Sequence, residues 1–81
     1  MEIENKIRAY VEENFVRSAG GGSITNDDSL LESGILDSAG IFQLVVFLEE
    51  AFGVVIADED IIVDNFENVT CIAKFVNSKV A

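Results

Sequence analysis

The sequence predicts an all-α protein, a four-helix bundle of three longer helices and one short helix, with a long loop between helices 1 and 2. Three observations favour this fold. Apolar residues recur every three or four positions in three separate stretches, which is the period of an amphipathic helix. The one run with strand-like composition, Val54–Ile56, has no second strand to pair with. With 81 residues, the chain is expected to form a single domain over residues 1–81 around one small core.

The first helix is expected over residues 2–18. Glu2 and Glu4 near its start and Arg17 near its end match the helix dipole. The run Gly20–Gly22 is expected to end it and to open a long connection to Asp37. The apolar face of this helix consists of Ile3, Ile7, Tyr10, Val11 and Phe15.

The connection that follows is long for a compact domain. Loops of this length are uncommon unless their own apolar residues hold them against the protein. Four residues are expected to do so: Leu30, Leu31, Ile35 and Leu36.

The second long helix is expected over residues 38–52. It is apolar around most of its circumference, and only Gln43, Glu49 and Glu50 are plainly polar. Such a helix is typically packed by neighbours on several sides, so a central position is expected. Gly53 stands where a left-handed C-cap residue is needed.

The remainder of the chain predicts an extended loop, a short helix and a last helix. The acids of Asp58–Asp60 suit the first turn of a short helix that ends near Ile62 or Val63. Asn65 or Asn68 is expected to cap the last helix. One face of that helix is expected to hold Val69, Ile72, Ala73, Val76 and Val80.

Charge is distributed unevenly along the chain. The net charge is −10, and positions 18–73 contain eleven acidic residues and no lysine or arginine. Such a field repels nucleic acids and anionic lipids and attracts partners with basic patches. The alternative is a charged surface that serves solubility alone. No apolar stretch approaches the roughly 20 residues that a bilayer requires, so a soluble protein is expected. The single cysteine and the lack of a basic patch followed by an apolar run at the N-terminus predict a cytoplasmic location. The protein is expected to be a monomer.

Several kinds of active site are excluded by composition. The chain has no histidine, and Cys71 is its only thiol, so neither a serine nor a cysteine relay with histidine can form, and no catalytic residue is expected. Cys71 is expected to be a buried or half-buried structural thiol. The acids at 58–60 lack the glycine and glutamate of a calcium loop, so no metal site is expected. The run Gly20–Gly22 lacks the lysine and the serine or threonine of a phosphate-binding loop, so no such loop is expected either.

The stretch GILDSAGIF, residues 34–42, raises a question about Ser38. A serine before an apolar helical run is an ordinary N-cap, because its oxygen can accept a hydrogen bond from an amide of the first turn. It can also be a site of attachment, and the two roles are compatible. Ala39 and Gly40 are expected to leave room for a modifying enzyme to reach the hydroxyl.

The segment DDSLLESGILDSAGIFQLVVFLEEAFGVVIADEDI, residues 27–61, resembles the central half of an acyl carrier protein. The resemblance depends on Leu31-x-x-Gly34, then Asp-Ser at the start of an apolar helix, then Leu-Glu-Glu and Phe-Gly at its end. With the flanking helices it covers nearly the whole chain.

This resemblance implies that Ser38 carries 4′-phosphopantetheine, derived from coenzyme A, through a phosphodiester, and that the thiol of the arm holds acyl groups as thioesters. The implied partners are a phosphopantetheinyl transferase and acyl-loading or acyl-transfer enzymes with basic docking patches. The implied function is delivery of acyl groups in fatty acid, lipid or polyketide-type biosynthesis. An aminoacyl or D-alanyl carrier and an unmodified acidic interaction module remain as alternatives.

Three positions depart from the family pattern. Ala39 replaces the usual leucine, Gln43 replaces the usual acid, and Phe42 is bulkier than the usual aliphatic residue. These differences indicate a specialised carrier rather than a general fatty-acid one, with Ala39, Phe42, Gln43 and Val46 important for partner choice. Phe42 has a second interpretation, as a core residue that limits the acyl cavity.

Overall fold

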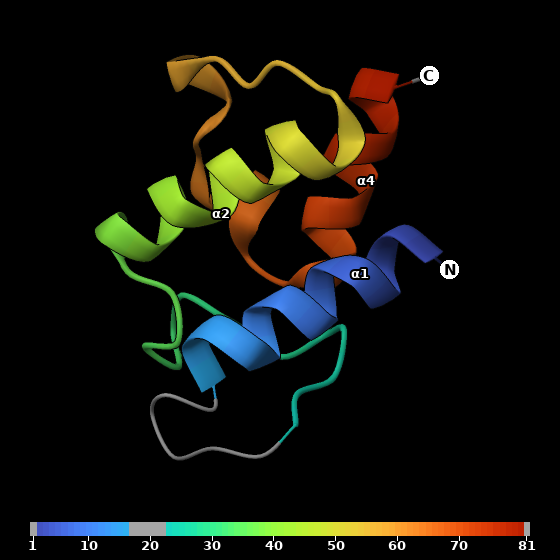
Figure 1. The fold of residues 1–81 in the computed structure, drawn as a ribbon. Helices are drawn as coiled ribbons and strands as arrows, with labels where there is room; N and C mark the ends of the chain where they lie inside the picture. Colours follow the sequence, from blue (N-terminus) through green and yellow to red (C-terminus); the bar gives the residue numbers. More distant parts are fainter. Residues whose placement is uncertain (1, 17–22, 81) are drawn as a thin grey trace.

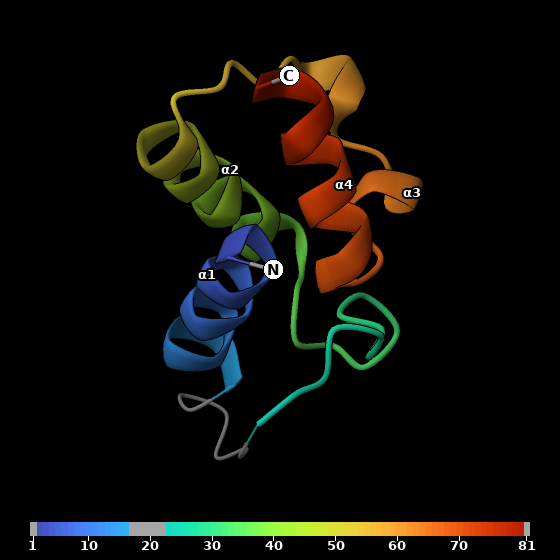
Figure 2. The same cartoon turned by 90° about the vertical axis from the view of Figure 1, so that its right-hand side faces the viewer.

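The computed structural model describes residues 2–16 and 23–80, which contain helices and no strand. Figures 1 and 2 show three longer helices, α1, α2 and α4, and the short α3 beside α4. The all-α prediction is therefore confirmed. In chain order the elements are α1 (Glu2–Val11), the π-helical turn η1 (Glu12–Val16), α2 (Ser38–Phe52), the 3-10 turn η2 (Asp58–Asp60), α3 (Val63–Phe66) and α4 (Val69–Val80).

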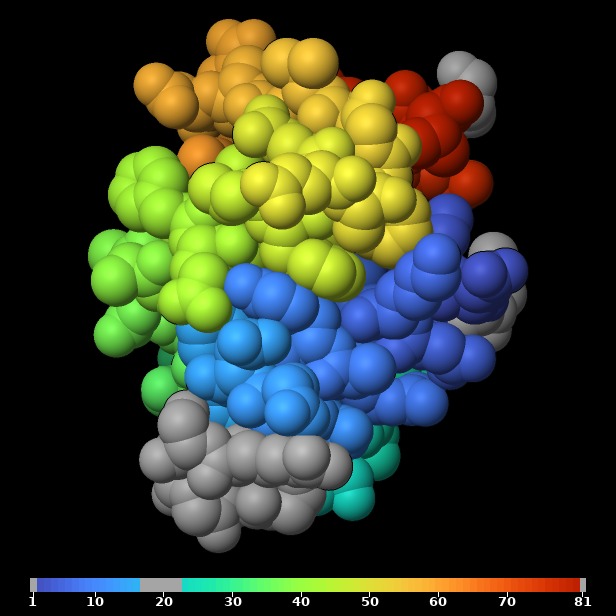
Figure 3. Space-filling model, in the orientation of Figure 1, coloured from blue at the N-terminus to red at the C-terminus, as the bar shows by residue number. Residues whose placement is uncertain are grey.

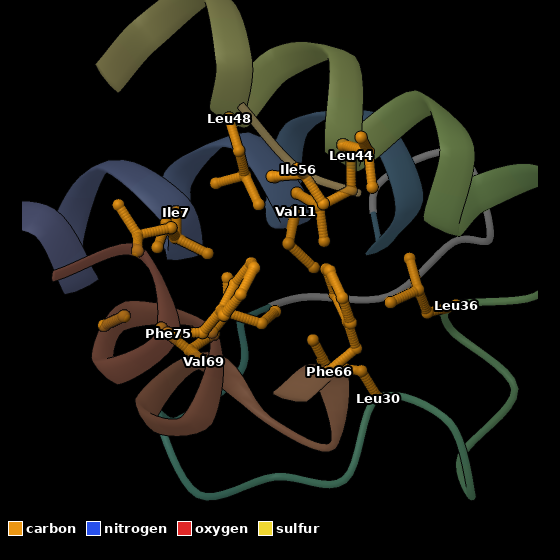
Figure 4. Close-up of a cluster of buried hydrophobic side chains, with 14 of the residues drawn as sticks. Ile7, Val11, Leu30, Leu36, Leu44, Leu48, Ile56, Phe66, Val69 and Phe75 are labelled. Carbon is orange, nitrogen blue, oxygen red and sulfur yellow. The ribbon is translucent and has the colours of Figure 1, made fainter. Parts of the chain in front are cut away.

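The core lies where the three longer helices and the loop before α2 meet (Figure 4). Phe66 of α3 is completely buried there and is the largest fully buried side chain. Burial of these apolar side chains is the main favourable term for folding. The other large, fully buried side chains in the described part of the chain are Ile7, Val11, Leu30, Leu44, Leu48, Val69, Ile72 and Val76.

The first helix forms as predicted through Val16, but its last five residues, Glu12–Val16, have π-helical hydrogen bonding. Ile7 and Val11 are buried, and Phe15 is half-buried. The expected helix end at residues 17–18 and the glycine run lie outside the described residues.

The loop before α2 is held by its apolar residues, as predicted. Leu30 and Leu36 are buried, and Leu31 and Ile35 are half-buried. The Leu30 amide donates to the Glu67 carbonyl at 2.8 Å, which ties this loop to the segment before α4. This bond and the burial of Leu30 and Leu36 hold the loop that leads into α2 against the core.

The predicted short helix begins at Asp58 as expected, but it is a 3-10 turn that ends at Asp60, and the short α-helix α3 was not predicted. Residues Asp58–Asp60 form only a 3-10 turn, and the short α-helix begins at Val63. The acids suit a helix start, but the turn ends after three residues, and packing of Phe66 in the core places the next helical residues later. Ile62 and Val63 are exposed.

The last helix is capped by Asn68, whose side-chain oxygen accepts the Cys71 amide at 2.8 Å. Asn65 instead donates its side-chain amide to the Asp60 carbonyl, so it caps no helix. The predicted buried face of α4 is correct except for Val80, which is exposed at the last turn, whereas Phe75 is buried. Cys71 is a half-buried free thiol. In the described part of the chain, no helix is long and apolar enough to cross a membrane.

Candidate functional site

Ser38 is the first residue of α2 and is exposed to solvent. The helix starts at one edge of the molecule, where the green ribbon in Figure 1 leaves the loop. The residue before it, Asp37, has an extended backbone, and its carboxylate accepts the Gly40 amide at 2.7 Å. Asp37 is therefore the N-cap, and the prediction that Ser38 caps the helix is wrong. An N-cap must precede the first helical residue in order to reach amides of the first turn, and Ser38 is already helical.

The Ser38 hydroxyl has no hydrogen-bond partner among the residues that the structure describes. The amides of Gly40 and Ile41 bond to the side chain and carbonyl of Asp37. Those of Ser38 and Ala39 lie at the positive end of the helix dipole, which favours a negatively charged group. The site therefore offers a free hydroxyl beside amides that can stabilise an anion.

Gly40 has a different role from the one the sequence suggested. It is buried, and a Cβ atom at this position would lie 3.2 Å from atoms of Asp37, Leu36 and Phe15. The absence of a side chain lets the first turn of α2 approach Phe15 of η1 closely. Gly40 thus serves internal packing, and the exposed, small Ala39 is the neighbour that leaves Ser38 open.

Helix α2 ends as predicted at Gly53, which has φ 67° and donates its amide to the Glu49 carbonyl at 3.0 Å. The Glu49 carboxylate also accepts the Ile56 amide at 3.0 Å. The bond between the Ile56 amide and the Glu49 carboxylate holds the extended segment after α2 in place. Glu49 is one of the two acidic residues of that helix.

The two faces of α2 differ in their surroundings. Its inward face is buried and consists of Gly40, Leu44, Val45 and Leu48. Its outward face contains Phe42, which is 60% exposed, and Val46, which is 53% exposed. Helix α2 has neighbours on several sides, as expected, but its outward face is open to solvent, which the sequence did not predict. Phe42 is not a core residue, which leaves its interpretation as a surface residue.

An aromatic seam joins α1 to α2. The rings of Tyr10 and Phe47 stack with centroids 3.9 Å apart and planes 12° from parallel. Phe15 and Phe52 contact this pair edge-on. Figure 3 shows the surfaces of α1 and α2 in contact with each other. The seam sets the position of α2 relative to α1.

Several acidic side chains accept hydrogen bonds from backbone amides or from a hydroxyl group. Glu12 accepts the Ile24 amide at 2.9 Å, and Glu67 accepts the Ser29 hydroxyl at 2.9 Å. Over residues 2–16 and 23–80, no cluster of three or more potential ligand side chains could hold a metal ion. Sequence reasoning missed these contacts, because only the fold brings the partners together.

One comparison with known proteins identifies a family. A family model described as a phosphopantetheine attachment site matches residues 5–76. A search of curated proteins found no match to the chain. The matched region begins within α1, ends within α4 and includes Ser38.

Proposed function

The chain belongs to the phosphopantetheine attachment family, and we propose that Ser38 is the residue to which the group is bound, through a phosphodiester on its side-chain oxygen. Proteins of this family carry covalently attached 4′-phosphopantetheine. The observation that supports Ser38 most directly is its exposed hydroxyl, unpartnered among the described residues, on the first residue of α2. When attached, the arm supplies a terminal thiol that holds an acyl group as a thioester.

The residues around Ser38 fit such a group. The amides of the first turn and the helix dipole favour the negative charge of a diester. The Asp37 carboxylate holds this turn in place by its bond to the Gly40 amide. Ala39 is exposed and places no bulky side chain beside the hydroxyl.

The other described serines fit less well. The hydroxyls of Ser29, Ser33 and Ser78 donate to Glu67, to the Leu30 carbonyl and to the Phe75 carbonyl, respectively. Ser23 lies in a loop and starts no helix. Of these serines, Ser38 alone combines exposure, a free hydroxyl and a helix N-terminus.

The function that follows is that of a carrier. The protein holds acyl groups as thioesters and delivers them to partner enzymes in fatty acid, lipid or polyketide-type biosynthesis, without catalytic residues of its own. Its acidic residues favour partners with basic docking patches, because positions 18–73 contain no basic residue.

The test is coexpression with a promiscuous phosphopantetheinyl transferase, followed by measurement of the intact mass. We expect the protein to gain one phosphopantetheine, Ser38→Ala to gain none, and the control Ser33→Ala to gain one. An arm on the Ser38→Ala protein would contradict the assignment to Ser38. An unmodified parent protein would favour the acidic interaction module instead.

A further inference from the structure

We propose that Phe15, in the π-helical turn η1, is a positioning residue for the modification of Ser38, because its ring supports the first turn of α2. The inference rests on the proposed attachment at Ser38 and concerns how precisely the hydroxyl of that residue is presented to the transferase. The sequence predicts only that Phe15 belongs to the apolar face of the first helix. The contacts of its ring give it this further role.

The π-helical turn determines where the ring of Phe15 points. In an α-helix, Phe15 would continue the buried stripe of Ile7 and Val11, since residues four apart lie on one face. The i→i+5 hydrogen bonds of a π-helix place more residues in each turn, so each residue rotates less around the helix axis. Phe15 therefore lies on the side of Tyr10, whose ring it contacts edge-on with centroids 6.0 Å apart. Tyr10 in turn stacks on Phe47, so this side of α1 faces α2.

The ring of Phe15 lies against the backbone of Gly40, two residues after Ser38. A Cβ atom at Gly40 would be 3.2 Å from Cε1 of the ring, which is closer than an ordinary van der Waals contact. The amide of the same glycine donates to the Asp37 carboxylate at 2.7 Å. The turn that carries Ser38 is thus held by a packing contact and by a hydrogen bond, and both meet at Gly40. Removal of the ring would take away the packing contact, because a close-packed interior leaves no other atoms to replace it.

Attachment of the arm requires a defined position of the Ser38 oxygen. In this step the oxygen forms a bond to the phosphorus of the pantetheine phosphate in coenzyme A, and the bond from that phosphorus to the bridging oxygen of the pyrophosphate breaks. The adenosine bisphosphate half of coenzyme A leaves with the bonding electron pair, and the hydroxyl proton passes to a base of the transferase or to water. A misplacement of about 1 Å can cost such a step on the order of a hundredfold in rate. A looser first turn of α2 should therefore lower kcat more than it raises KM.

The experiment measures kcat and KM of a promiscuous phosphopantetheinyl transferase for the apo protein in the presence of coenzyme A. The test variants are Phe15→Ala and the milder Phe15→Leu. The matched control is Phe52→Ala, because Phe52 is half-buried like Phe15 and each ring packs edge-on against the stack of Tyr10 and Phe47. Phe52 is the last residue of α2 and lies at the opposite end of that helix from Ser38. Circular dichroism melts show whether each variant is folded at the assay temperature.

A second measurement reports on the first turn of α2 independently of activity. The amides of Gly40 and Ile41 donate to the side chain and carbonyl of Asp37, so their hydrogen exchange slows while this turn is closed. Exchange at these two amides should be about tenfold faster in Phe15→Ala and unchanged in Phe52→Ala. Equal exchange in the two variants would overturn the inference.

We expect Phe15→Ala to lower kcat about tenfold with KM changed less than about twofold, and Phe15→Leu to lower kcat about threefold. Phe52→Ala should leave both constants within about twofold of the parent, although it removes a ring of the same size. Equal kcat values for Phe15→Ala and Phe52→Ala would contradict the inference, as would a change confined to KM. If Phe15→Ala does not fold, Phe15→Leu supplies the test, and an unchanged kcat in that variant would contradict it.

The same experiment separates this inference from the proposed function. If the parent protein accepts no arm, the proposed function fails and the role of Phe15 with it. If the arm is attached but kcat does not respond to the Phe15 variants, only the positioning role is wrong.

Discussion

The inward and outward faces of α2 are both apolar, yet they have different roles. Leu44 and Leu48 on the inward face are completely buried, whereas Phe42 and Val46 on the outward face are more than half exposed. Both sets share the same helix and the same apolar character. Hydrophobicity alone therefore does not identify the core residues of this helix. Apolar residues that remain exposed to solvent are candidates for contact with a partner.

The largest contrast is expected from truncating one side chain on each face. Leu44→Ala should lower the free energy of unfolding by about 2–5 kcal/mol, because it leaves a cavity in the core. Val46→Ala should change it by less than about 0.5 kcal/mol, because the side chain faces solvent. Chemical denaturation of both variants measures the difference, and comparable losses would abolish the distinction between the two faces.

A second comparison of the two faces of α2 adds a methyl group to Gly40 in the first turn of the helix. Gly40→Ala should destabilise the protein by about 1–2 kcal/mol, because crowding against Phe15, Leu36 and Asp37 outweighs the better helix propensity of alanine. Gln43→Ala on the outward face should have an effect within about 0.5 kcal/mol. Urea unfolding measures both values. Stabilisation by Gly40→Ala would mean that its neighbours yield easily.

The two phenylalanines of α2 provide a matched pair. Phe47→Val should cost about 1 kcal/mol or more, since Phe47 is half-buried and stacks on Tyr10. Phe42→Val should cost less than about 0.5 kcal/mol, because its ring is mostly in solvent. Thermal melts of the two variants compare them directly, and a greater loss for Phe42→Val would place that ring in the core after all.

Asp37 and Ser38 are neighbours at the start of α2, but only Asp37 caps the helix. Asp37→Ala should lower stability by about 1 kcal/mol, because the Gly40 amide loses its acceptor. Ser38→Ala should change stability by less than about 0.5 kcal/mol while it abolishes attachment of the arm. Denaturation curves combined with intact mass separate the two functions. A Ser38→Ala protein that is less stable than Asp37→Ala would reverse the assignment of the cap.

The smallest effect on stability is expected from the ion pair between Lys79 and Asp60, which lies outside α2. Lys79 Nζ lies 3.0 Å from Asp60 Oδ2, and this hydrogen bond, followed by that from the Ala57 amide, holds the pKa of Asp60 below its usual 3.8. A lowered carboxyl pKa in the folded state means that the contribution to stability is present above pH 3.8 and is lost as the pH falls through the folded pKa. An NMR titration should show this pKa move toward 3.8 in Lys79→Met. An unchanged titration would assign the shift to Ala57.

Local sequence signals were sufficient for most of the secondary structure. Apolar spacing placed α1, α2 and α4, Gly53 marked the end of α2, and Leu30 and Leu36 identified the loop residues that pack inside. These features depend on residues close together in the chain, so a helical period or a left-handed glycine is visible without the fold. The short helix α3 was not predicted, because it packs through Phe66 in a core that is built from residues distant in the sequence.

The candidate site also shows which features the sequence determines and which need the fold. The sequence alone determined an acidic, helical chain with a serine at the start of an apolar helix, and its resemblance to acyl carrier proteins made Ser38 the candidate attachment residue. Only the tertiary structure decided that Asp37 is the cap, that Gly40 faces inward and that Phe42 lies outside. The physical reason is that helical periodicity relates the residues of α2 to one another, whereas packing of α1, α4 and the preceding loop decides which of its apolar sides is removed from water.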